Sequence, residues 1–98
     1  MGWTETTARQ RVGREAAAII ERRRDGLLPW DPAWQAAFAD RRDLLDHLVV
    51  TWRRQQQGQD DPGLDPLARG RVRRDLAARH AGLLLVMRRH GRVVGDVA

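Results

Sequence analysis

The hydrophobic positions of this chain fall at helical spacing in three stretches that turn-forming residues separate. In the first stretch, residues 4–24, the apolar positions form one narrow stripe, which consists of Ala8, Val12, Ala16, Ile19 and Ile20. Asp25 and Gly26 follow, and glycine readily adopts the left-handed conformation that ends many helices. The pattern therefore predicts a first helix that ends just before Gly26.

A second helix is predicted over residues 31–57, ended by Gly58. Asp31 is a good N-cap residue, and Pro32 fits the first helical position, where no amide donor is needed. The apolar side chains share one broad face, which consists of Trp34, Ala37, Phe38, Leu44, Leu45, Leu48, Val49 and Trp52, with Arg41 among them. Because so wide a face can contact two neighbours, we expect this helix to be central. Its core residues should include Trp34, Phe38, Leu45, Leu48 and Trp52.

A third helix is predicted over residues 65–90, because Asp65 and Pro66 repeat the same start signal and Gly91 ends the stretch. Residues 83–97 have an alternative interpretation as a β-hairpin with its turn at residues 89–91. An isolated two-stranded hairpin is only marginally stable in water, which favours the helix. The expected fold is therefore all-α: a three-helix bundle with long helices in a single domain, residues 1–98, with the C-terminal hairpin as the alternative.

Two tryptophans, Trp30 and Trp34, stand on either side of the Asp31–Pro32 start signal. We expect them to clamp the turn between the first two helices. A pair that stacks on a ligand or base is the alternative interpretation.

The composition leaves little room for catalysis. All 18 basic residues are arginine, the net charge is +5, and the chain has no lysine, serine, tyrosine or cysteine. Covalent catalysis therefore lacks its usual nucleophiles, and a thiolate metal site has no ligands. We expect no enzymatic activity, no cofactor and no metal.

One cluster of acid–base groups remains, formed by Asp40, Asp43 and His47 at positions i, i+3 and i+7 of the second predicted helix. These residues share one face and could begin a metal site or an oriented acid–base pair. That face is nearly opposite the apolar face of the same helix, so we expect it to be a solvated surface.

The chain carries no sequence signal for a membrane. Its longest apolar run covers residues 83–87, far short of the roughly 20 residues that cross a bilayer. The first residues have no apolar stretch like that of a signal peptide. The expectation is a cytoplasmic protein.

The C-terminal part offers more apolar surface than one helix face needs. Residues 83–87 are all apolar, and Arg88, Arg89 and Arg92 follow. An apolar centre with an arginine rim is typical of protein interfaces. We therefore predict a non-enzymatic interaction module, either a homodimer or a binder of another protein. Its expected contact residues are Leu84, Leu85, Arg88 and Arg89, with Trp3 a weaker candidate.

The apolar side chains outside the main stripes support self-association, and these are Val50, Leu67 and Leu85. The competing interpretation is that residues 83–87 simply complete the core of a monomer.

A nucleic-acid-binding protein is the alternative function. Arginine clusters could contact phosphates, and their residues are Arg22, Arg23, Arg53, Arg54, Arg73, Arg74, Arg88, Arg89 and Arg92. Residues 73–92 are only faintly similar to a helix-turn-helix. The helix that would read bases begins with three leucines where polar side chains are needed, so we do not assign the chain to that family.

Overall fold

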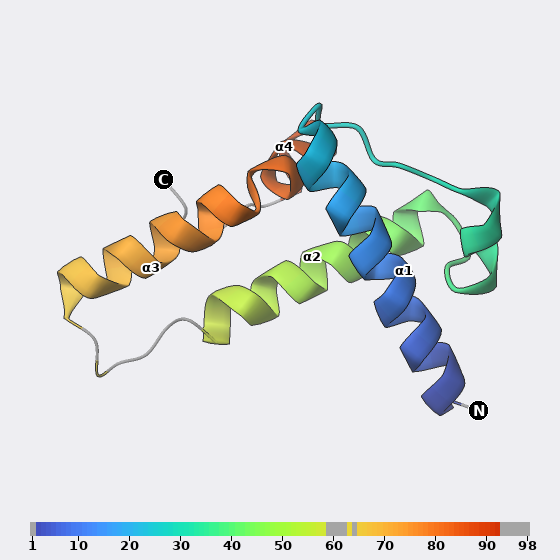
Figure 1. Cartoon of the computed structure of the whole chain (residues 1–98), viewed down its shortest axis with the longest axis horizontal. Helices are drawn as coiled ribbons and strands as arrows, with labels where there is room; N and C mark the ends of the chain where they lie inside the picture. Colours follow the sequence, from blue (N-terminus) through green and yellow to red (C-terminus); the bar gives the residue numbers. More distant parts are fainter. Residues whose placement is uncertain (1, 59–62, 64, 93–98) are drawn as a thin grey trace.

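The computed structural model describes residues 2–58, 63 and 65–92, with side chains from residue 6 onward, and over these residues the fold is all-helical (Figure 1). The helices are α1 (Gly2–Arg23), α2 (Arg41–Gly58), α3 (Pro66–Arg79) and α4 (Ala81–Arg89), and a short 3-10 helix, η1 (Pro32–Ala36), lies between α1 and α2. The predicted all-α class is confirmed. The alternative hairpin is wrong as far as Arg89, because α4 occupies that stretch. Residues 93–97 of the hairpin lie outside the described residues.

The second predicted helix is divided in two because the sequence holds two start signals. Asp31 caps η1 and not α2. The start of α2 is capped by Asp40, whose Oδ1 accepts a hydrogen bond from the Asp43 backbone N–H at 2.8 Å. The Asp43 carboxylate in turn accepts one from the Ala39 N–H at 3.0 Å. This reciprocal arrangement is close to a capping box, and it moves the start of α2 to Arg41.

The third predicted helix is divided at His80, whose side chain makes no capping bond to α4. Glu21 of α1 supplies the cap, since its two carboxylate oxygens accept from the Gly82 and Leu83 N–H groups, each at 2.8 Å. Gly82 lies so close to α1 that a Cβ atom there would be 2.4 Å from the carbonyl oxygen of Ile20. The break therefore lets α4 pack on α1 while α3 leaves in another direction (Figure 1).

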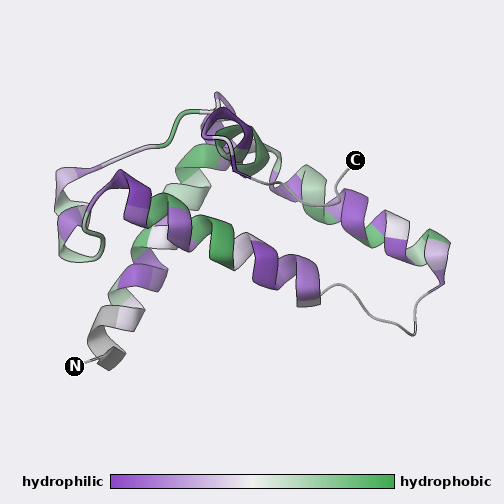
Figure 2. Ribbon diagram, turned by 180° about the vertical axis from the view of Figure 1, so that it is seen from behind, coloured by the Kyte–Doolittle hydropathy of each residue, from purple (hydrophilic) through white to green (hydrophobic). Residues whose placement is uncertain are grey.

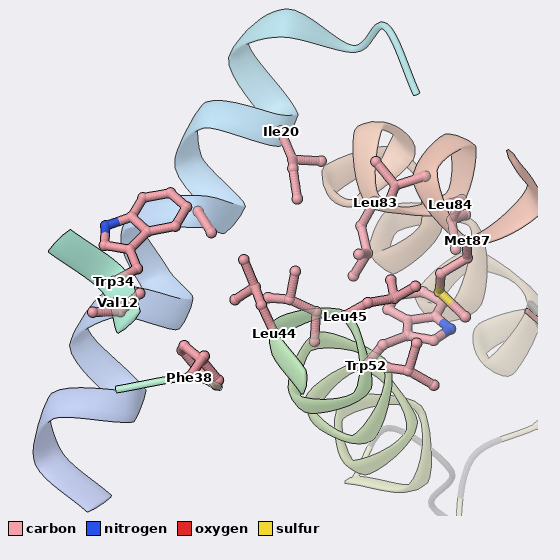
Figure 3. Close-up of a cluster of buried hydrophobic side chains, with 14 of the residues drawn as sticks. Val12, Ile20, Trp34, Phe38, Leu44, Leu45, Trp52, Leu83, Leu84 and Met87 are labelled. Carbon is pink, nitrogen blue, oxygen red and sulfur yellow. The ribbon is translucent and has the colours of Figure 1, made fainter. Parts of the chain in front are cut away.

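The core lies where α1, α2 and α4 meet. Figure 3 shows Leu83, Leu84 and Met87 of α4 gathered beside Leu45 and Trp52 of α2. At the other end of the core, Trp34 and Phe38 of the connection lie near Val12 of α1. The five predicted core residues are confirmed, each no more than 6% exposed: Trp34, Phe38, Leu45, Leu48 and Trp52.

The expected three-helix bundle with a central second helix is not confirmed. Helix α1 packs mainly on α4 and less on α2. Helix α4 is the most deeply buried for its length, with Gly82, Leu83, Leu84, Val86 and Met87 all buried.

Helix α3 is an arm with little buried surface. Leu76 is its one buried residue, and Leu67 near its start is 77% exposed. Figure 2 shows the hydrophobic residues concentrated where α1, α2 and α4 meet, whereas hydrophobic and hydrophilic residues are mixed along α3. The stability of this arm therefore depends on its attachment to α4 more than on its own packing.

Candidate anion-binding groove

A groove of about 700 Å³ opens between the linker that follows α1, the first turns of α2 and the end of α4. We call it the basic groove and define it by its lining residues, which are Leu27, Leu28, Arg41, Arg42, Leu45, Arg89, His90, Gly91 and Arg92. Its volume is within the range of ligand-binding pockets. It combines three leucines with four arginines, so both apolar and ionic contacts are available.

The linker wall is shaped by a turn. The Leu27 N–H donates to Asp25 Oδ1 at 2.9 Å, a local bond that favours chain reversal. Gly26 has a φ of 75° and is buried against Leu85 of α4, where a Cβ atom would lie 3.6 Å from the Leu85 carbonyl oxygen. This placement leaves Leu27 47% exposed at the groove, with Leu28 half-buried beside it.

The α2 wall is fixed by the Asp40 cap. Arg41 and Arg42 occupy the first two positions of α2 and are exposed, while Leu45, one turn later, is buried at 4%. Asp40 already accepts a bond from an amide of the first turn. An anion in the groove would therefore be bound by the arginines and not by the helix end.

The α4 wall is fixed by a Schellman motif at the end of the helix. Gly91 has a φ of 68°, its N–H donates to the Arg88 carbonyl at 3.2 Å, and the Arg92 N–H donates to the Met87 carbonyl at 2.8 Å. This turn directs the chain back toward α2, where the Arg92 guanidinium forms a hydrogen-bonded ion pair with Asp46. The pair connects the end of α4 to α2.

The charges of the groove are only partly neutralised. Arg92 has its partner in Asp46, whereas Arg41, Arg42 and Arg89 make no ion pair within the part of the chain that the structure describes. Guanidinium groups match the planar geometry of carboxylates and phosphates. Three such groups around a concave surface create a positive potential that favours an anionic partner.

The predicted partner-binding residues lie in different environments. Leu84 is 5% exposed and packs in the core, whereas Leu85 is 40% exposed beside the linker. Arg88 and Arg89 are exposed, and Arg89 lines the basic groove. In residues 83–87 only Leu85 is exposed, so the core interpretation holds for the other four. The side chain of Trp3 lies outside the described part of the structure.

The arginines of the alternative nucleic-acid interface are distributed over all four helices. Arg22 and Arg23 end α1, and the others on helices are Arg53 and Arg54 of α2, Arg73 and Arg74 of α3, and Arg88 and Arg89 of α4. Arg89 and Arg92 line the basic groove. Helices α3 and α4 do form a helix–turn–helix in the literal sense. However, α4 exposes only Leu85, Arg88 and Arg89, so it presents few of the polar side chains that a base-reading helix uses.

The acid–base cluster serves the fold. Asp40 and Asp43 cap α2, and Arg9 of α1 donates to the Asp43 carboxylate at 3.2 Å while its guanidinium lies 4.4 Å from the centre of the Phe38 ring. The Arg9 hydrogen bond, together with one from the Ala39 N–H, lowers the pKa of Asp43. Among the described residues, no group of three or more His, Cys, Asp and Glu side chains is arranged to hold a metal ion.

His47 is not on a solvated surface, and that expectation is wrong. Its ring centroid lies 5.2 Å from that of Phe38, and it fits against Gly13 of α1, where a Cβ atom would be 2.8 Å from His47 Nε2. Burial lowers the pKa of His47, and the nearby charge of Arg9 lowers it further. The expectation fails because α2 packs on α1 through the helix face that carries His47.

The tryptophan pair holds the connection between α1 and α2, consistent with the predicted clamp. Trp30 and Trp34 meet edge to face, with ring centroids 6.2 Å apart, and Trp34 is 6% exposed. Trp30 is half-buried and lines a second, more open hollow of about 410 Å³. This hollow shares Arg41 and Arg42 with the basic groove, so the two depressions adjoin at these arginines.

Most of the groove was not predicted. Arg41, Arg42, Leu27 and Leu28 were not identified as site residues, and Leu45 was identified only as core. A signal did exist, because Asp40 and Asp43 flank the two arginines in the pattern of a capped helix start.

Within the described residues, none of the helices combines the length and the apolar character that a membrane crossing requires. Comparisons with protein-family models, with curated proteins and with solved structures found no match.

Proposed function

We propose that the protein is a small non-enzymatic interaction module of the cytoplasm that binds an acidic protein partner in the basic groove. The observation that carries the proposal is the combination of exposed leucine surface with three arginines, Arg41, Arg42 and Arg89, that have no acidic partner among the described residues. Arginine is enriched at the energetic centres of protein interfaces.

The expected partner surface consists of carboxylates. Each exposed ion pair contributes little by itself, roughly 0–1 kcal/mol. Several carboxylates that meet several converging arginines contribute more, and they raise the association rate at low salt. Binding should therefore weaken as the salt concentration rises.

A labelled poly-glutamate peptide tests this proposal by fluorescence anisotropy. The double variant Arg41→Gln/Arg89→Gln should weaken binding by about tenfold, since it removes two exposed ion pairs that contribute up to about 1 kcal/mol each. The matched control is Arg53→Gln/Arg54→Gln, which removes the same charge from exposed positions of α2 outside the groove. Equal weakening by both variants would indicate attraction to net charge and would contradict the groove.

Nucleic-acid binding is the second candidate, and the charge of α3 favours it. This helix carries five arginines, Arg69, Arg71, Arg73, Arg74 and Arg79, against the single acid Asp75. A labelled DNA duplex should then bind with a steep salt dependence. Arg73→Gln/Arg74→Gln should weaken that binding while Arg41→Gln/Arg89→Gln leaves it nearly unchanged. No duplex binding at low salt would remove this candidate.

A further inference from the structure

We infer that the partner of the basic groove is an elongated peptide segment in which acidic residues are interspersed with large apolar ones. This inference rests on the proposed function and specifies the chemistry of the partner. It follows from the residues of the groove, its neighbouring hollow and the distribution of charge around both.

The apolar part of the groove requires apolar side chains from the partner. Leu27 is 47% exposed, Leu28 is half-buried, and both lie on the groove with Leu45. Poly-anions without apolar groups would leave this surface in contact with water. Side chains such as leucine would remove it from water and so add to the affinity.

The charged part requires carboxylates that reach arginines on two different elements. Arg41 and Arg42 project from the start of α2, and Arg89 projects from the last turn of α4, so the unpaired charges come from two different elements. Carboxylates separated by an apolar residue can contact both elements at once. A peptide can alternate acidic and apolar side chains in this way, whereas a single compact anion cannot.

The neighbouring hollow favours an elongated occupant. It adjoins the groove at Arg41 and Arg42, and Trp30 provides a further half-buried apolar surface in it. A segment that lies across the two arginines would place apolar side chains in both depressions, with its carboxylates on the arginines between them. A small amphiphilic anion would fill one depression only.

The same features disfavour nucleic acid in this groove. The groove lining contains no Trp, Tyr or Phe side chain on which a base could stack and only one small aromatic ring, the imidazole of His90, while Trp30 in the adjoining hollow already packs edge to face on Trp34. A phosphodiester backbone has no apolar group to cover Leu27 and Leu28. The arginine-rich α3, outside the groove, is the better surface for nucleic acid.

Two labelled peptides of equal charge test the inference. In the first, glutamates alternate with leucines, and in the second, serines replace the leucines. The glutamate–leucine peptide should bind at least about tenfold more tightly, because burying leucine side chains adds affinity of that order. Leu27→Ser should remove most of this difference. The matched control is Leu67→Ser, which changes an even more exposed leucine on α3 and should leave the difference intact.

The outcomes separate this inference from the proposed function. Both peptides could bind equally, with Arg41→Gln/Arg89→Gln weakening the binding of both. The proposed function would then be supported, and the inference that the partner needs apolar residues would be wrong. If neither peptide binds, both the inference and the proposed function are wrong. Tighter binding of a single-stranded oligonucleotide than of the glutamate–leucine peptide, with the same sensitivity to Arg41→Gln/Arg89→Gln, would assign the groove to nucleic acid. If a fatty acid displaces the glutamate–leucine peptide and binds with the same affinity as that peptide, the groove is a site for small amphiphiles.

Discussion

Two glycines inside helices have opposite structural roles. Gly82 faces the backbone of α1, so a methyl group at this position would overlap the Ile20 carbonyl. Gly70 on α3 faces only the Arg74 guanidinium, where a Cβ atom would lie 3.3 Å from Nη1. A flexible side chain can move away at little cost, whereas the backbone of a packed helix cannot.

The two glycines therefore give opposite predictions. Gly82→Ala should lower the free energy of unfolding by roughly 1–3 kcal/mol, because α4 must move away from α1. Gly70→Ala should raise it by up to about 1 kcal/mol through helix propensity. Urea unfolding followed by far-UV circular dichroism measures both. If Gly82→Ala is as stable as the wild type, the backbones of α1 and α4 do not approach each other closely enough to exclude a methyl group at this position.

His47 makes stability depend on pH. Its pKa in the folded protein is lowered by burial and by Arg9, while the unfolded chain keeps an ordinary value near 6.5. As the pH falls through 6.5, the unfolded chain therefore takes up a proton that the folded protein still resists, so stability is lost. The loss is complete once the pH is below the lowered folded pKa. His80, whose pKa burial also lowers, acts in the same direction.

Urea unfolding at several pH values on either side of 6.5 tests this expectation. The free energy of unfolding should decrease as the pH is lowered through this window, and His47→Gln should make the decrease smaller. The matched control is His90→Gln, which makes the same substitution at an exposed position. An identical slope in wild type and His47→Gln would contradict the prediction.

At the scale of elements, α4 is a short helix that other segments hold in place. The N–H groups of Gly82 and Leu83 in its first turn are capped by Glu21, and the turn that follows the helix is tied to α2 through the Arg92–Asp46 ion pair. Because Arg89 is carried by this helix, both attachments also set the shape of the basic groove.

Removing the Glu21 cap should destabilise the protein. Glu21→Ala leaves the Gly82 and Leu83 N–H groups without their acceptor and should lower the free energy of unfolding by about 1–2 kcal/mol. Glu15→Ala is the control, since it removes the same charge from an exposed position on α1. Urea unfolding of both variants gives the comparison. Equal effects would mean that the cap contributes nothing beyond its charge.

At the scale of the whole molecule, the predicted self-association remains a prediction. Val50, Leu67 and Leu85 are 45%, 77% and 40% exposed, but they lie on three different helices. Leu85 presents exposed apolar surface beside Gly26 of the linker. A two-fold pairing over this apolar surface is therefore the arrangement to test.

Light scattering at high micromolar concentration provides that test. The wild-type protein should show the mass of a dimer, and Leu85→Asp should give a folded monomer, because a charge on this surface opposes burial. A monomeric wild type would rule out the homodimer. A Leu85→Asp protein that unfolds would instead mean that Leu85 belongs to the core.

Local patterns in the sequence determined the helical class, the capping aspartates, the turn glycines at positions 26 and 91, and the five predicted core residues. These features depend on residues within a turn or two of one another, so a pattern along the chain is enough to predict them. Even the missed start of α2 at Arg41 was of this kind, because its signal lies in the adjacent Asp40 and Asp43.

The tertiary structure alone decided the rest. The break at His80 depends on Glu21, which is 61 residues from Gly82 in the sequence. The basic groove combines a linker, a helix start and a helix end that no local spacing relates, and the burial of Leu84 beside the exposed Leu85 depends on where α1 crosses α4. Contacts between distant segments are set by the packing of whole helices, and periodicity within one helix carries no information about them.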